Sequence, residues 1–134
     1  MADINFDITK VTIDASKIME LSIFANDKIE EHENGKYSLT TNYNASPIRS
    51  DDGDVFLDLL LEINSDGAPT YDVKIKTRTC FFFPKGSDED SQNEYLRTIG
   101  TVRAFDYARS YLQMITSFGA WGEFKLPGIP IPEK

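Results

Sequence analysis

The sequence of 134 residues contains one cysteine, one histidine and one tryptophan, and it has no long apolar run. A single cysteine, Cys80, cannot form a disulfide within the chain, which favours a reducing compartment. No stretch reaches the roughly eighteen consecutive apolar residues that a membrane-spanning helix needs. The first residues also lack the basic start and apolar core of a secretory signal. We therefore expect a cytoplasmic protein.

Motifs that carry chemistry are also missing. There is no phosphate-binding glycine loop, no GxGxxG and no pair of cysteines at metal-ligand spacing. His32 stands in a charged run beside a turn and Cys80 stands among phenylalanines, so neither indicates a catalytic group. The aspartates Asp51, Asp52 and Asp54 could hold calcium, but their spacing is not that of an EF-hand, and a solvated turn is the better interpretation. We expect a protein that is not an enzyme, with no catalytic residue, no metal site and no cofactor.

Basic residues are scarce as well. Fourteen Lys and Arg against 22 Asp and Glu give a net charge of −8. A nucleic-acid-binding protein needs a basic face to displace counterions from phosphates, so we expect no nucleic-acid partner. An acidic surface keeps a protein soluble even where it exposes apolar side chains, and it would also suit a basic partner.

The first two-thirds of the sequence alternate between apolar and polar residues, as β-strands do. The alternation begins at Ile4 and restarts at Val11 and Leu21, and each restart indicates a bulge or bend in one long strand. Asn34-Gly35 predicts a turn, and Pro47 with the aspartates after it predicts the next loop. Short turns favour an antiparallel meander. The predicted inward-facing residues of the later strands are Tyr37, Leu39, Thr41 and Tyr43, then Val55, Leu57, Leu59, Leu61 and Ile63, and then Tyr71, Val73 and Ile75.

After the strands the period changes to that of a helix. Residues 84–93 read as an acidic loop, in which Ser91 and Glu94 have the spacing of a capping box. A long helix over about 94–118 would end at Gly119, and residues 119–134, with their prolines, read as an extended tail. The prediction is a single α+β domain over residues 1–134. A four-stranded antiparallel meander sheet over about 4–83 carries one long C-terminal helix packed on it.

The predicted helix carries two apolar stripes. One of them suffices to pack the helix on a sheet, and the other lies roughly 110° around the helix axis. The second stripe is covered either by the C-terminal tail folding back or by another copy of the chain. We favour the second alternative and predict an oligomer interface. The first stripe is Phe105, Ala108, Leu112 and Ile115, and the second is Tyr107, Tyr111, Met114 and Phe118.

Apolar residues also exceed what one core needs. Phe81-Phe82-Phe83 cannot all face one side of a sheet, since successive strand residues point to opposite faces. The segment from Trp121 to Leu126 alternates apolar side chains within a proline-flanked tail. Core packing would explain each feature separately. Together, on an acidic chain, they indicate a groove for an extended apolar peptide.

Several of these residues resemble a known family. Tyr107-Ala108-Arg109, then Met114-Ile115-Thr116-Ser117 and Gly119, then Phe124-Lys125-Leu126-Pro127 and Ile131, are similar to the C-terminal signature of the SecB protein-export chaperones. The resemblance implies an ATP-independent holdase, a homodimer or homotetramer with helices packed between sheets, and client grooves lined by the first two strands and the post-helix segment. It implies structural roles for Tyr107 and Arg109 in the helix. The client-binding residues would be Phe6, Ile8, Tyr37, Leu39, Phe82, Trp121, Phe124 and Leu126.

Two hypotheses of function follow. Family members usually continue into a second helix that helps to wall the groove and contact the SecA motor, whereas this sequence stops at Pro132-Glu133-Lys134. The resemblance is therefore that of a divergent branch, attached to a toxin–antitoxin system or carried by a phage. The leading hypothesis is a holdase for unfolded or extended polypeptides, serving export or toxin–antitoxin control, with a SecA-like motor or a toxin–antitoxin protein as further partner. The alternative is an acidic adaptor or inhibitor that uses the same scaffold to bind one specific partner.

Overall fold

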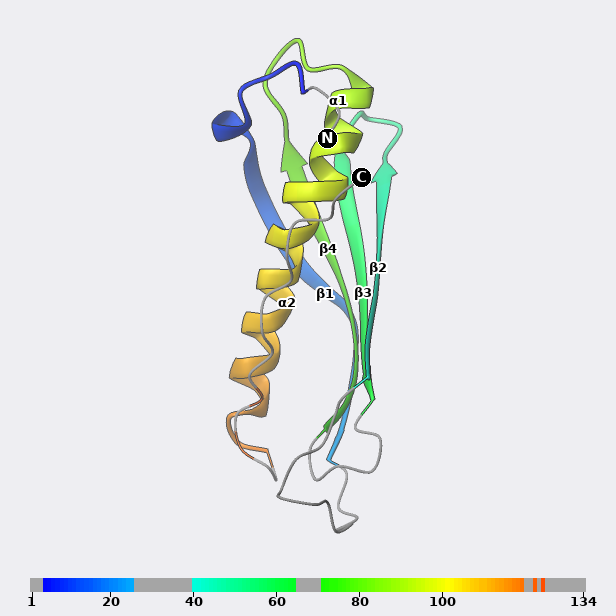
Figure 1. Cartoon of the computed structure of the whole chain (residues 1–134), viewed down its shortest axis with the longest axis vertical. Coiled ribbons are helices and arrows are strands. Elements are labelled where there is room, and N and C mark those ends of the chain that lie inside the picture. Colours follow the sequence, from blue (N-terminus) through cyan, green and yellow to red (C-terminus); the bar gives the residue numbers. More distant parts are fainter. Residues whose placement is uncertain (1–3, 26–39, 65–70, 120–121, 123, 125–134) are drawn as a thin grey trace.

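An antiparallel sheet of four strands, with a helical layer over one face, makes up the part of the chain that the structure describes (Figure 1). This computed structural model describes residues 4–25, 40–64, 71–119, 122 and 124. The predicted α+β fold, a four-stranded antiparallel sheet with a long C-terminal helix, is confirmed. The strands are β1 (Thr12–Ala25), β2 (Thr40–Arg49), β3 (Val55–Asn64) and β4 (Tyr71–Phe82), and the helical layer consists of α1 (Glu89–Tyr95), a π-helical segment (Leu96–Gly100) and α2 (Thr101–Thr116).

The order of the strands across the sheet is β1-β4-β3-β2. The predicted meander is therefore right for β2, β3 and β4, which follow one another, and wrong for β1, which lies beside β4 at the opposite edge from β2. This is the order of a Greek key. Asn34-Gly35 lies outside the described residues, but the strands on either side of it do not pair, so it does not close a hairpin between them.

The long first strand bends as its sequence predicts. The pairing of β1 with β4 shifts between Ile13 and Ala15 and again between Ile18 and Glu20, which confirms the expected bulges. The strand starts later than predicted, because residues Ile8–Lys10 form a 3-10 turn. That turn is capped by Asp7, whose carboxylate accepts a hydrogen bond of 3.0 Å from the backbone N–H of Thr9.

The second strand runs further than predicted. Pro47, expected in a loop, lies within β2 and pairs with Leu57 of β3. Proline has no N–H to donate, and it is tolerated here because β2 is the last strand of the described sheet. Tyr43 lies in the same strand and packs edge-on against Phe105 of α2, with ring centroids 6.2 Å apart. The edge of the sheet is thereby held against the helical layer.

The core lies between the sheet and the helical layer. The predicted inward-facing residues of β3 and β4 are all buried, and three residues of the first helical stripe pack against them. On the opposite face, Asp58 is buried and accepts two hydrogen bonds, of 2.7 and 2.9 Å, from Arg78. The core residues from these elements are Val55, Leu57, Leu59, Leu61, Ile63, Tyr71, Val73, Ile75, Phe81, Phe105, Ala108 and Leu112.

The helical layer starts five residues before the predicted Glu94. Asp88 is the N-cap, and its carboxylate accepts a hydrogen bond of 2.7 Å from the backbone N–H of Ser91. Asp and Ser are about equally good N-caps, so the capping-box spacing could not decide between them. Ser91 lies inside the helix instead, where its hydroxyl accepts a hydrogen bond of 3.0 Å from the backbone N–H of Asn5. That bond attaches the N-terminal segment to α1.

Candidate functional site

A groove of about 790 Å³ lies between β2 and the helical layer. Tyr43, Ala45 and Pro47 line it from β2, and they face the helices because their partners across the sheet are buried on that side. Asn93 and Arg97 line the groove from the helical side. The groove therefore runs beside a strand that forms one edge of the described sheet. Its size is that of a site that takes side chains of a ligand.

The polar groups at the rim of this groove are held in place. Arg49, near the end of β2, donates hydrogen bonds of 2.7 Å to the side-chain oxygen of Gln92 and 2.8 Å to that of Asn93. Its guanidinium also lies 3.8 Å from the carboxylate of Glu89. Strand and helix are thereby connected at one end of the groove. A rim fixed in this way gives a preformed site, which costs less ordering on binding.

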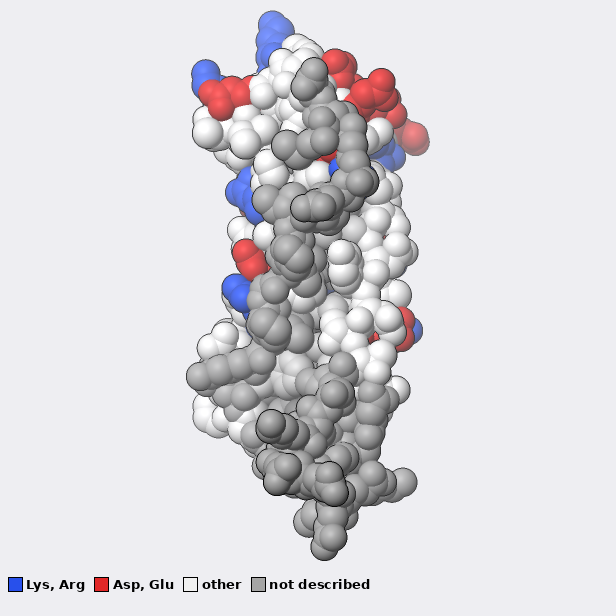
Figure 2. All heavy atoms as spheres, viewed as in Figure 1, with Lys and Arg blue, Asp and Glu red and all other residues white. Residues whose placement is uncertain are grey.

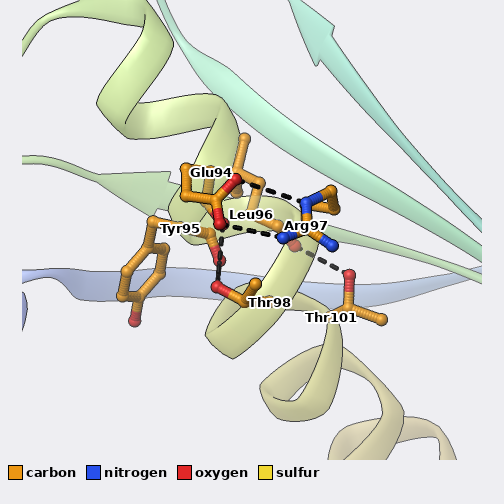
Figure 3. Close-up of polar contacts among 6 residues, drawn as sticks. All are labelled: Glu94, Tyr95, Leu96, Arg97, Thr98 and Thr101. Atoms are coloured by element: carbon orange, nitrogen blue, oxygen red, sulfur yellow. Dashed lines mark hydrogen bonds and ion pairs between the residues drawn. The ribbon is translucent and has the colours of Figure 1, made fainter. Parts of the chain in front are cut away.

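The π-helical segment shapes the helical wall of the groove (Figure 3). A π-turn leaves carbonyls without their usual α-helical partners. Two backbone carbonyls in this region accept hydrogen bonds from hydroxyls: Thr98 donates one of 2.8 Å to the carbonyl of Glu94, and Thr101 donates one of 2.7 Å to the carbonyl of Leu96. Arg97 donates to both carboxylate oxygens of Glu94, at 2.8 and 3.3 Å. Both cations that line the groove, Arg49 and Arg97, are therefore already paired with carboxylates, and the groove is not a strong anion site.

A second apolar surface is formed by α2 and β1. Met114 and Phe118 are 65% and 98% exposed, and Tyr107 is exposed beside them. Ile18 and Leu21 of β1 are also exposed, and they lie on the helix-facing side because their partners in β4 are buried there. We call these residues, with Ile115 of α2, the apolar strip: Ile18, Leu21, Tyr107, Met114, Ile115 and Phe118.

The fourth residue of the predicted second stripe is engaged within the protomer. The hydroxyl of Tyr111 donates a hydrogen bond of 2.8 Å to the backbone carbonyl of Ser16 in β1, and its side chain is partly buried. This bond connects α2 to the edge strand. The predicted interface residues therefore divide into three that are exposed and one that packs inside the chain. Whether the exposed ones meet another copy stays a prediction.

The predicted client-binding residues do not gather at one place. Phe82 is 47% exposed and Ile8 is exposed, whereas Phe6 is partly buried, with its ring 5.4 Å from that of Phe83. Phe124 is only 6% exposed, and its ring packs edge-on against Tyr71 with centroids 6.2 Å apart. A side chain so buried belongs to the core, which corrects its expected place beside the groove. Tyr37, Leu39, Trp121 and Leu126 lie outside the described residues.

The groove beside β2 was not found by sequence reasoning. The sequence predicts a long helix over about 94–118 and a loop over residues 84–93, which does not bring Arg97 and Asn93 together in one groove wall. The signal that could have found it is Pro47, because proline within an alternating strand marks an edge strand. An edge strand next to a long amphipathic helix borders a cleft wherever the helix does not cover the strand.

The part of the chain that the structure describes was also searched for metal ligands, membrane-spanning helices and a reactive thiol. Its His, Cys, Asp and Glu residues form no group of three or more that could hold a metal ion. None of its helices is long and apolar enough to cross a membrane. Burial raises the pKa of the Cys80 thiol above its ordinary value, and the nearby carboxylates of Asp54 and Asp14 add to the rise. A thiol whose pKa is raised is a poor nucleophile at neutral pH.

Comparison with known proteins gives structural matches. No family model matches the sequence, and no curated protein sequence matches it. The structure is similar to that of the SecB-like chaperone Rv1957 of Mycobacterium tuberculosis, in complex with a ChAD peptide from the Rv1956 HigA1 antitoxin. The TM-score is 0.65 and the identity 14%, over 91% of this chain and 93% of that chain. This likeness shows a SecB-like α+β fold. A Streptococcus agalactiae protein of unknown function aligns at a TM-score of 0.48 and 10% identity, over 98% and 100% of the two chains, which is too weak to carry an argument.

Proposed function

We propose that this protein is an ATP-independent, cytoplasmic holdase that binds unfolded or extended polypeptides. The observation that supports it best is the preformed groove beside β2, on a fold similar to that of a SecB-like chaperone. An extended client segment can pair its backbone with an edge strand while its alternate side chains enter the groove. Such binding depends little on the client's sequence, because main-chain hydrogen bonds are the same in every polypeptide.

The energetics suit weak contacts repeated over several sites. Burial of apolar surface contributes about 25 cal/mol per Å², so one large side chain entering the groove contributes only a few kcal/mol. Part of this is offset by the loss of freedom on binding. Linking several grooves in one assembly raises the apparent affinity without any new contact. We therefore propose a homodimer or homotetramer that is joined through the apolar strip.

The physiological partner belongs to the same proposal. The similar Rv1957 structure holds a peptide from an antitoxin. By analogy, we propose that clients of this protein include a toxin–antitoxin protein or a chain destined for export, with a SecA-like motor as further partner in the second case. Each would be recognised through an extended segment.

An acidic adaptor or inhibitor remains the second candidate. Figure 2 shows acidic side chains gathered at the end of the molecule where α1 lies. The first turn of α1 contributes two exposed acids, Glu89 and Asp90. The turn between β2 and β3 contributes two more, Asp51 and Asp52. Such a surface would attract one basic partner and steer its approach.

An aggregation assay separates the two candidates. We expect the protein to suppress light scattering by at least two unrelated, chemically denatured proteins at a stoichiometric ratio and without ATP. Protection of none of them, with one discrete complex isolated instead, would replace the holdase by the adaptor.

Replacing Tyr43 by Ser should weaken this protection several-fold. The change removes an exposed aromatic side chain from the groove wall, and such side chains provide most of the binding energy at interfaces. Ile48→Ser is the matched control, since Ile48 lies on the same strand but on the other face of the sheet. The measurement is the client concentration protected by a fixed amount of each variant, with thermal melts to show that both are folded. Equal protection by both would remove the groove from the proposal.

A further inference from the structure

The backbone groups of β2 point in directions that the structure defines. Ser50, the residue after the strand, donates its N–H to the carbonyl of Asp54 at 3.0 Å, so its N–H points toward β3. Successive residues of an antiparallel strand direct their N–H and C=O groups to opposite sides. Every second residue before Ser50 pairs with β3, and the residues between them point to the other side, which we call the outer edge of β2. The residues that point to the outer edge are Thr41, Tyr43, Ala45, Pro47 and Arg49.

The same residues direct their side chains toward the groove. Side-chain direction and N–H direction both alternate with a period of two, so the two are coupled along a strand. Tyr43, Ala45 and Pro47 accordingly line the groove. The same coupling holds for an extended segment that pairs antiparallel with the outer edge. Its residues with side chains in the groove are also those that donate their N–H groups to β2.

Pro47 interrupts the row of donors along the outer edge. The pairing of β2 with β3 runs from Thr40 to Arg49 without a register shift, which a proline allows when its nitrogen points away from the partner strand. An incoming segment can still donate to the carbonyl of Pro47, but its own carbonyl at that position finds no N–H. Main-chain pairing therefore weakens at this residue.

The side chain of Arg49 bridges to the helical layer just beyond the interruption. Its hydrogen bonds to Gln92 and Asn93 join the C-terminal end of β2 to α1 (Figure 1). A segment that continued past Pro47 would meet this bridge as well as the missing donor. Two separate features therefore end the usable part of the outer edge at the same point.

We propose that Pro47 is a stop that sets the register of a bound polypeptide, which pairs antiparallel with Tyr43 and Ala45 and leaves β2 at Pro47. This inference rests on the proposed binding of extended polypeptides in the groove. The preferred client segment is short, about five residues for the span from Thr41 to Ala45, and it ends in a turn or a chain terminus. Short pairing keeps each contact weak and its release fast.

The stop also favours a client over the β2 edge of a second copy. Antiparallel pairing of two β2 edges brings in one proline from each copy, so two donors are missing from the shared ladder. A client segment that ends opposite Ala45 meets no missing donor. The outer edge is thereby protected from self-association along its length and stays usable for clients.

The first test probes the pairing on the unmodified protein. Labelled five-residue peptides with blocked ends alternate phenylalanine with serine, beginning and ending with phenylalanine. One analogue is N-methylated at the central phenylalanine and the other at one serine. We expect fluorescence anisotropy to show a loss of affinity of roughly three- to tenfold for the first, because its N–H faces β2, and of less than about twofold for the second. An equal loss for both, or a larger loss for the serine analogue, would overturn the proposal.

The second test restores the missing donor. Pro47→Thr supplies an N–H at the outer edge, and a seven-residue peptide of the same pattern is long enough to reach it from Thr41. We expect this variant to bind the seven-residue peptide roughly three- to tenfold more tightly than the unmodified protein does, and the five-residue peptide with less than about twofold change. Ile48→Thr is the matched control, since the N–H of Ile48 already points toward β3, and it should change neither affinity. Thermal melts show that both variants are folded.

The outcomes separate the stop from the proposed function. No gain with Pro47→Thr, or an equal gain with Ile48→Thr, would overturn the stop, while suppression of aggregation by the same protein would leave the holdase in place. Absence of both peptide binding and suppression of aggregation would overturn the proposed function and the stop together.

Discussion

Two negative charges in the apolar strip, one in the last turn of α2 and one just beyond its end, are expected to dissociate the proposed oligomer into protomers. The variant is Met114→Glu with Phe118→Glu, two side chains that are 65% and 98% exposed in the protomer. Removing them costs the protomer little, but a carboxylate that must be buried against another copy loses its hydration without gaining a partner. Light scattering should give an oligomer for the unmodified protein and a mass near 15.2 kDa for the variant, with unchanged circular dichroism.

Gln113→Glu is the control for this result. Gln113 is exposed on the same helix, but it lies outside both apolar stripes, so its substitution adds a charge without touching the apolar strip. We expect this variant to keep the mass of the oligomer. An unmodified protein of 15.2 kDa, or an unchanged mass in the double variant, would contradict assembly through the strip and favour its coverage within one chain.

A charge at Tyr111 would not test assembly alone. Its hydroxyl bonds to the backbone of β1 within the protomer, so a charge at this position would also loosen α2 from the sheet. Helical periodicity placed Tyr111 in the same stripe as Met114, since both lie on one side of the helix. Periodicity indicates direction only, and whether a side chain reaches a neighbouring strand depends on the strand's position.

The parts of the fold that could be predicted from the sequence depend on local alternation. The burial of β3 follows from apolar residues at every second position, beginning at Val55 and ending at Ile63. The bulges of β1 follow from interruptions of the same alternation. In each case the preference of one strand for one face decides the outcome, without reference to its neighbours.

The parts that could not be predicted depend on which elements become neighbours. Alternation gives β1 an inward face, but it does not say that β4 rather than β2 lies beside it. The same limit explains Phe124, which was expected beside the groove and instead packs on Tyr71. An apolar residue in a tail serves a core equally well as a groove, and only the position of the tail decides between them.

The candidate site was missed for a similar reason. Tyr43 and Arg97 are far apart in the sequence, and neither belongs to a recognisable motif. They line one groove because β2 ends the described sheet on the side where the π-helical segment lies. A groove between an edge strand and a neighbouring helix is hard to predict, because neither element carries a sequence motif for it.

The other large effect is expected in the core. Leu112→Ala should lower the free energy of unfolding by about 3 kcal/mol, because Leu112 is fully buried between α2 and the sheet and its loss leaves a cavity. For a chain of this length the thermal midpoint should fall by roughly 10 °C. Urea unfolding at one protein concentration measures the change without a contribution from altered assembly.

Gln113→Ala, at the next position, should change the free energy of unfolding by less than about 0.5 kcal/mol, since Gln113 is exposed and alanine is a good helix former. Comparable losses at both positions would contradict the packing of α2 on the sheet through the stripe of Phe105, Ala108 and Leu112.

Assembly provides a second check on the same helix. If the two stripes have separate roles, Leu112→Ala reduces stability while the protein stays oligomeric, and the double variant of Met114 and Phe118 dissociates while its protomer stays folded. If Leu112→Ala left the stability unchanged and the double variant stayed oligomeric, the assignment of one stripe to the core and the other to the oligomer interface would be wrong.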